Sequence, residues 1–140
     1  MYFGVDYHPE QWVYPYGGTQ EATEAEWERD IEMMTAAGVN VVRIGEYTWG
    51  LCEREEGKFD FSWMKRAMDL LAKADIKVVL ATPTAAPPIW LAKKHPEILP
   101  LDENGLVKHE GTRRAVCLNS EAYWNYSRAI VENLAKTLGS

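Results

Sequence analysis

A short apolar run in this 140-residue chain passes directly into charged and aromatic side chains. Residues 41–49 read Val-Val-Arg-Ile-Gly-Glu-Tyr-Thr-Trp, the pattern of a buried parallel strand whose carboxyl end opens into a polar site. Ligand-binding groups gather at that end of the strands in α/β proteins. Arg43, with Tyr47 and Trp49 beside it, suits a hydroxyl-rich, ring-shaped ligand such as a sugar. From these residues alone, an Arg43–Glu46 ion pair that merely closes the strand is an equal alternative.

Other reactive side chains carry weaker signals. Asp6, Glu10 and Glu46 lie at the ends of expected strands, so Glu46 paired with Asp6 or Glu10 as general acid and base is a further alternative. The histidines (His8, His95 and His109) lack metal-ligand spacing, and we expect them to be solvated or to cap polar groups. The tryptophans Trp12, Trp49 and Trp90 are expected to pack loops rather than stack on sugars.

Composition limits the classes of protein. The apolar share is 46%, the charged share is 26% and the net charge is −6, which indicates a globular protein that binds neither nucleic acid nor anionic membranes. No apolar stretch approaches the roughly 20 residues that span a membrane, and the first residues do not read as a signal peptide. Cys52 and Cys117 are too few and too far apart for a disulfide scaffold. We expect a cytoplasmic protein.

One pattern occurs three times along the chain: a short apolar strand, a polar loop and an amphipathic helix. Strands are expected at residues 2–7, 40–46 and 77–82. The first helix is expected to open on a capping box at Thr23–Glu26 and to stop at Gly38. The second runs from Ser62 to about Ala74. Asp75 follows it in the left-handed conformation, which is usually adopted by Gly. The third runs from about Glu121 to Leu138, capped by Asn119 or Ser120.

The apolar positions of these helices predict their buried faces. We expect the following residues to be buried: Trp27, Ile31 and Met34 on the first helix; Trp63, Ala67, Leu70, Leu71 and Ala74 on the second; Ala122, Tyr126, Ile130, Val131 and Leu134 on the third. Between the third strand and the third helix, prolines confine residues 89–94 to a single helical turn. Asn104-Gly105 predicts a hairpin within residues 99–107.

Three strand–helix units predict parallel strands joined by right-handed crossovers. A doubly wound sheet and a (β/α)₈ barrel both satisfy this pattern. No Gly-rich phosphate loop follows any strand, and the long loops after the strands favour the barrel. The fold class is therefore α/β, with residues 1–140 forming the first three βα units of a (β/α)₈ TIM barrel that eight units would complete.

Five blocks of sequence, in order, resemble the opening of glycoside hydrolase family 42, the family of largely microbial β-galactosidases. The blocks are residues 4–12 (GVDYHPEQW), 42–49 (VRIGEYTW), 82–91 (TPTAAPPIWL), 96–100 (PEILP) and 113–120 (RRAVCLNS). The resemblance implies a retaining enzyme that hydrolyses terminal non-reducing β-D-galactose residues with two carboxyl groups. In this family those groups follow the fourth and seventh strands. No catalytic residue is therefore expected within this chain, and the isolated chain is expected to be inactive.

The resemblance also assigns roles to particular residues. It implies that Arg43 contacts the bound sugar beside the nucleophile, with Glu46 as its supporting partner. Cys117 matches the first of four cysteines that bind a structural zinc in some members. One thiolate cannot hold zinc, so the metal is expected only in the complete protein, where a small buried thiol is the equal alternative. A trimer-like homo-oligomer is implied for the full-length protein.

Two other functions stay open. A different retaining barrel glycosidase would share the fold and the mechanism. A non-catalytic partial barrel would self-associate through its sheet edges or bind sugar weakly.

Overall fold

The computed structural model describes residues 1–13, 18–109 and 116–139, and these form two compact units. The first unit comprises Met1–Gly45 and Ser62–Ala81, and the second comprises Glu46–Phe61 and Thr82–Ser140. The division falls at the carboxyl ends of two strands. The first unit therefore holds three strands with two helices. The second holds the segment between the second and third of these strands up to Phe61, together with the chain after the third.

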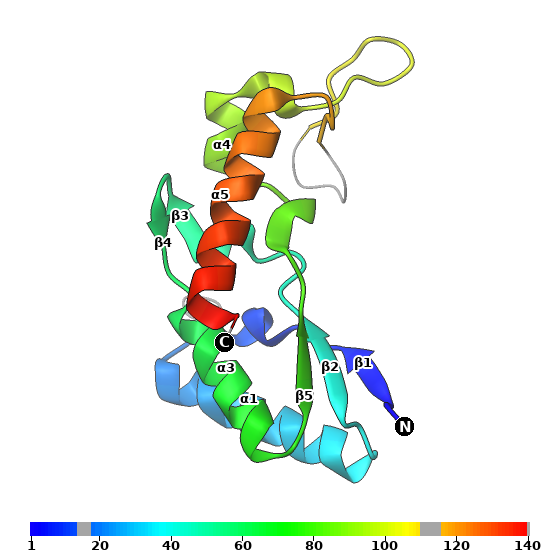
Figure 1. Cartoon of the computed structure of the whole chain (residues 1–140), viewed down its shortest axis with the longest axis vertical. Coiled ribbons are helices and arrows are strands. Elements are labelled where there is room, and N and C mark those ends of the chain that lie inside the picture. Colours follow the sequence, from blue (N-terminus) through cyan, green and yellow to red (C-terminus); the bar gives the residue numbers. More distant parts are fainter. Residues whose placement is uncertain (14–17, 110–115, 140) are drawn as a thin grey trace. The chain divides into compact units, whose positions relative to one another are not determined.

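A three-stranded parallel sheet is the centre of the first unit (Figure 1). It contains β1 (Gly4–Asp6), β2 (Val41–Ile44) and β5 (Lys77–Leu80), in the order β1-β2-β5. The parallel arrangement predicted from the sequence is confirmed. The regular strands are shorter than predicted. Hydrogen bonds from the Tyr7 amide to the Arg43 carbonyl and from the Ala81 amide to the Ile44 carbonyl continue the pairing beyond the strand ends.

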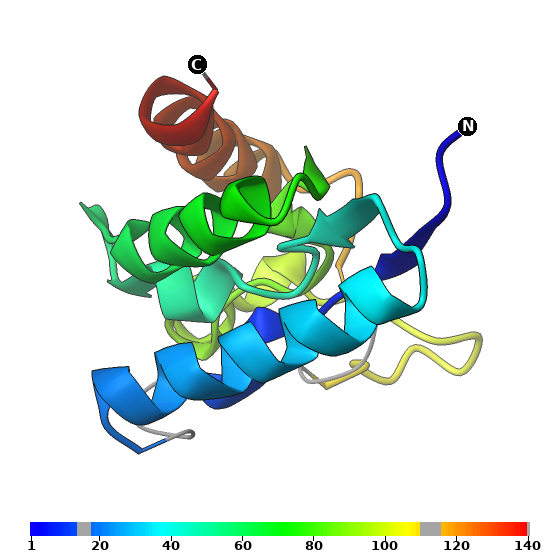
Figure 2. The same cartoon turned by 90° about the horizontal axis from the view of Figure 1, so that it is seen from below.

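One face of this sheet is covered and the other is open. Val42 and Ile44 are almost completely buried, whereas Val79 is 53% exposed. The helices α1 (Gln20–Ala36) and α3 (Ser62–Lys73) pack side by side on the covered face (Figure 2). The apolar strands predict a sheet covered on both faces. In this chain only the helix face is covered, as expected of a barrel whose opposite face lines its interior.

The start of α1 differs from the prediction. The helix begins at Gln20, and the Thr19 hydroxyl accepts a hydrogen bond from the Ala22 amide at 3.2 Å. Thr23 lies inside the helix, where its hydroxyl donates to the Trp12 carbonyl at 2.5 Å. The capping box predicted at Thr23 is therefore wrong, because Thr19 supplies the cap one turn earlier and the tertiary contact takes the Thr23 hydroxyl. Gly38 has a φ of 81°, which confirms the left-handed stop.

The α3 helix matches its predicted bounds to within a residue, and Asp75 after it has a φ of 55°, as expected. Its buried face is rotated slightly from the prediction. Met64 is fully buried, while Leu70 and Ala74 are only half-buried. On α1, Met34 is likewise half-buried although Trp27 and Ile31 are buried.

The second unit contains elements that the sequence pattern did not predict. These are the short helix α2 (Trp49–Cys52) and the antiparallel hairpin of β3 (Glu53–Glu55) and β4 (Lys58–Phe59). The predicted turn α4 (Ile89–Lys94) is confirmed. Asn104-Gly105 does form a turn, with Gly105 at a φ of 79°, but only one bridge between Leu101 and Val107 continues it. Three short 3₁₀ helices complete the elements: η1 (Pro9–Trp12), η2 (Pro83–Ala85) and η3 (Pro96–Ile98).

The last helix, α5 (Glu121–Leu138), has the predicted bounds, and Ser120 caps it by accepting from the Tyr123 amide. Its buried residues are Tyr123, Ser127, Ile130 and Leu134. Three predicted core positions, Ala122, Tyr126 and Val131, are only half-buried. Tyr126 lies at the edge of the core because its hydroxyl binds a carboxylate. No helix in the described part of the chain is long and apolar enough to cross a membrane.

We predict that the isolated chain self-associates, because the open face and edge of the sheet expose apolar side chains. Tyr2 is 71% exposed, Phe3 56% and Val79 53%, and unpaired strand edges recruit other strands. Sedimentation velocity should show mass rising with protein concentration, and a dye for exposed apolar surface should bind.

Val79→Thr should reduce this association, since it removes an exposed apolar contact. The matched change Val42→Thr, at a residue only 1% exposed, should instead destabilise the fold by about 1–3 kcal/mol. A monomeric chain with a sharp, cooperative unfolding transition would contradict the prediction.

Candidate functional site

The sequence-predicted sugar ligand Arg43 lies on β2, on the open face of the sheet. Asp6 on β1 is its register partner, and Arg43 Nη1 lies 3.3 Å from Asp6 Oδ1. Both side chains are substantially exposed, at 41% and 59%. Arg43 therefore has an ionic partner on the neighbouring strand, which the sequence pattern alone did not identify.

The backbone beside Asp6 is anchored through Tyr7. The Tyr7 amide donates to the Arg43 carbonyl at 2.9 Å, and its hydroxyl donates to Asp30 Oδ2 on α1 at 3.1 Å. The Trp12 indole donates to the same Asp30 oxygen, also at 3.1 Å. Burial and the neighbouring Asp30 carboxylate raise the pKa of Tyr7 far above its ordinary value. Tyr7 is therefore a neutral donor that fixes the end of β1, and it is unsuited to act as a base.

The other polar residues after β1 also have partners. His8 Nδ1 lies 2.9 Å from Glu10 Oε1, while the second Glu10 carboxylate oxygen is buried without a hydrogen-bond partner among the described residues. Asp6 and Glu10 thus each face a basic side chain. These contacts give no positive support to the alternative in which Asp6 or Glu10 pairs with Glu46 as general acid and base.

In the second unit, a buried carboxylate that the sequence analysis missed organises the loop after β2. Glu53 is 2% exposed; one of its oxygens accepts from the Trp49 indole at 2.7 Å and the other from the Gly57 amide at 2.8 Å. The Trp90 indole donates to the Glu53 carbonyl at 2.9 Å. These contacts confirm that Trp49 and Trp90 pack the loops. No local sequence signal distinguishes Glu53 from its exposed neighbours.

A cluster of Glu56, Lys94 and Tyr126 ties the β3–β4 turn to α4 and α5. Lys94 Nζ donates to both Glu56 oxygens, at 2.7 and 2.6 Å, and the Tyr126 hydroxyl donates to Glu56 at 2.7 Å. The Trp90 ring meets Tyr126 edge-on, with centroids 5.6 Å apart. The hydrogen bonds from Lys94 and Tyr126 hold the pKa of Glu56 below its ordinary value.

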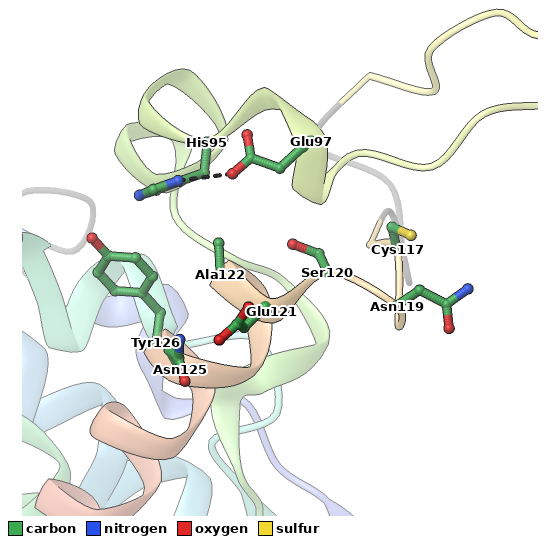
Figure 3. Close-up of a pocket in the computed structure, with 9 residues that line it drawn as sticks. All are labelled: His95, Glu97, Cys117, Asn119, Ser120, Glu121, Ala122, Asn125 and Tyr126. Atoms are coloured by element: carbon green, nitrogen blue, oxygen red, sulfur yellow. Dashed lines mark hydrogen bonds and ion pairs between the residues drawn. The ribbon is translucent and has the colours of Figure 1, made fainter.

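The sequence-predicted metal ligand Cys117 borders a pocket of about 780 Å³ before and along the start of α5. Figure 3 shows Cys117 and Asn119 at one end of this pocket and His95 and Tyr126 at the other. The Cys117 thiol is half-buried, and its amide donates to the Ile98 carbonyl. Among the residues that the structure describes, no three His, Cys, Asp or Glu side chains converge to hold a metal. The described residues therefore do not form a zinc site by themselves.

Two further sequence predictions concern cysteine and arginine. Cys52 is completely buried, which confirms its packing role. Arg113 and Arg114, which open the last of the five sequence blocks, lie outside the described residues.

Comparison with known proteins decides the family. Residues 6–140 match the model of glycoside hydrolase family 42, described as β-galactosidase. The chain belongs to this family. It is 41% identical over 136 residues to a β-galactosidase of Thermus sp and 40% identical over 136 residues to one of Halorubrum lacusprofundi. The two alignments cover 97% of this chain but only 20% and 18% of the relatives, so the chain spans about a fifth of their length.

Solved structures of β-galactosidases agree with this family. The chain superimposes on the H. lacusprofundi β-galactosidase with a TM-score of 0.86 at 40% identity, over 99% of this chain and 19% of the other. For the Bacillus circulans sp. alkalophilus enzyme the TM-score is 0.88 at 33% identity, and the match covers 100% of this chain and 19% of that enzyme. The catalytic domain of a Paenibacillus polymyxa β-amylase, 18% identical with a TM-score of 0.62, shares the fold alone. The predicted family and fold class, an amino-terminal part of the TIM barrel, are confirmed.

We predict that acid weakens the Glu56 cluster of this family 42 chain. Because the folded-state pKa of Glu56 is depressed, its stabilising contribution is complete above its unfolded value of about 4.3 and is lost as the pH falls through the folded-state pKa. Below about pH 4, the Tyr126 ring resonances should shift and hydrogen exchange in the β3–β4 turn should accelerate.

The Glu56→Gln variant should show this looser state already at pH 7. Glu55→Gln is the matched control, since the ion pair of Glu55 with Lys58 lies wholly within the hairpin. Tyr126 resonances that titrate in the same way in the wild-type chain and in Glu56→Gln would contradict the prediction.

Proposed function

We propose that this chain supplies the sugar-binding start of the catalytic barrel of a retaining β-galactosidase that removes terminal non-reducing β-D-galactose residues. The family match over residues 6–140 carries the proposal, and the relatives named above are β-galactosidases. A retaining glycosidase holds two carboxyl groups about 5–5.5 Å apart across the scissile bond. Following the family pattern, both come from later strands of the complete protein, and none comes from this chain.

Within this proposal Arg43 contacts the substrate. It stands at the carboxyl end of β2 on the open face of the sheet, where barrel enzymes place their binding groups. Its planar, permanently charged guanidinium has five N–H donors, enough to bind sugar hydroxyls and to orient a neighbouring carboxylate. A positive charge there also favours the ionised form of a nucleophilic carboxylate.

The direct test compares the complete protein with the 140-residue chain. The complete protein should hydrolyse p-nitrophenyl β-D-galactoside and release β-galactose first, as retention requires. The isolated chain should give no turnover, because it lacks both carboxyl groups. Faster hydrolysis of glucosides or arabinosides would indicate a different barrel glycosidase, and sugar binding without turnover by the complete protein would overturn the proposal.

Cys117 would be one of four zinc ligands in the complete protein, the other three being cysteines outside this chain. The half-buried thiol beside a pocket supports this role, and four thiolates form the tetrahedral set that structural zinc prefers. A structural zinc would stabilise the fold and take no part in hydrolysis. The full-length protein is further proposed to assemble as a trimer-like homo-oligomer, which its molar mass in solution checks.

We predict that the complete protein binds one zinc per subunit and that Cys117→Ser lowers this content severalfold. The serine hydroxyl is a poor replacement for a thiolate ligand, so the site loses affinity. Metal analysis after dialysis measures the effect. Cys52→Ser is the matched control, because Cys52 is fully buried and should affect folding but not zinc stoichiometry in the folded fraction. Equal zinc content in wild type and Cys117→Ser would contradict this role.

A further inference from the structure

We propose that Asp6 is a positioning residue that holds the Arg43 guanidinium toward the sugar. The inference rests on the proposed role of Arg43 and adds a residue that the family resemblance did not single out. Asp6 acts through Arg43, and its own contact with substrate is not required.

Strand register places the two side chains together. Asp6 pairs with Arg43, and Arg43 pairs in turn with Val79 on β5. Asp6, Arg43 and Val79 thus form one row of register partners across the three strands. Side chains in such a row project to the same face of a sheet. Val79 is 53% exposed while Val42, one position earlier on β2, is 1% exposed, so this row points away from the helices. Asp6 and Arg43 therefore meet on the open face, the side that becomes the barrel interior.

The backbone just after Asp6 is anchored to β2 and to α1. Tyr7, the next residue, bonds to the Arg43 carbonyl and to Asp30 on α1. Trp12 shares Asp30, so three contacts fix the chain just after Asp6. A carboxylate on such a fixed backbone gives Arg43 a defined direction, whereas a free arginine side chain samples many rotamers.

The contact with Asp6 involves one nitrogen of the Arg43 guanidinium. Asp6 accepts from Nη1 of Arg43 at 3.3 Å, and a guanidinium has five N–H donors in a rigid fork. Because the guanidinium group is planar and rigid, fixing the direction of one of its nitrogens also fixes the direction of the others. The main effect of Asp6 is geometric, because an exposed ion pair adds little stability.

The test is a double-mutant cycle on kcat/KM in the complete protein. Arg43→Ala should lower kcat/KM for a β-galactoside about 100-fold or more, and Asp6→Ala should lower it about tenfold. In the Arg43→Ala background, adding Asp6→Ala should cause no further loss, since Asp6 then has no guanidinium to direct. Asp6→Asn should retain part of the activity, because its amide oxygen still accepts a hydrogen bond.

Two readouts separate positioning from a structural role. The melting temperatures of the Asp6 variants should stay near that of wild type. Added guanidinium ion should partly restore Arg43→Ala but restore the double variant much less, since the Asp6 carboxylate holds the free cation in place. Asp69→Ala is the matched control: Asp69 forms a comparably exposed ion pair with Lys65 on α3, and its loss should leave kcat/KM unchanged.

The outcomes distinguish the two proposals. If Arg43→Ala leaves kcat/KM unchanged, the proposed role of Arg43 fails and the role of Asp6 fails with it. If Arg43→Ala is damaging but Asp6→Ala is neutral, only the positioning role fails. Fully additive losses would also overturn it, because they would mean that Asp6 acts independently of Arg43.

Discussion

The register between β1 and β2 is the constraint on which the sugar-binding proposal depends. Side chains alternate between the two faces of a strand, so a slip of one residue would turn Arg43 toward the helices and Val42 toward the open face. That slip would bury a guanidinium and expose two apolar side chains. The burial of Val42 and Ile44 against the helix layer therefore fixes the direction of Arg43. The same register brings Asp6, which lies 37 positions earlier, beside it.

The two units are stabilised by different kinds of contact. The first unit builds a sheet from apolar strands and supports it with two helices, and its polar contacts gather after β1 at Tyr7, Trp12 and Asp30. The second unit has few regular strands, and buried or clustered polar groups link its segments around an apolar core that includes Leu91, Ile98 and Ile130. Glu53 satisfies donors from two separate elements, and Glu56 joins the β3–β4 turn to two helices. Loops organised in this way have fixed shapes, as binding loops require.

Local chemistry made much of this structure predictable. Ser120 caps α5, Gly38 ends α1 and Asp75 takes the left-handed conformation, because each depends only on a residue and its close neighbours. The start of α1 was mispredicted because two threonines both suit a cap, and only the tertiary bond from Thr23 to the Trp12 carbonyl separates them. The β3–β4 hairpin and the burial of Glu53 depend on partners such as Trp49 and Gly57, whose roles no periodicity reveals. Family membership was predictable because five ordered sequence blocks identify it together. The ion pair of Arg43 with Asp6 was not, because it depends on strand register.

The most direct test is a crystal structure of the complete protein with bound galactose. We predict that the Arg43 guanidinium lies within about 3.2 Å of a galactose hydroxyl or of the nucleophilic carboxylate, with Asp6 bonded to its other side. A sugar bound elsewhere, or an Arg43 that touches neither the sugar nor the nucleophile, would contradict the central claim that this strand end forms part of the galactose site.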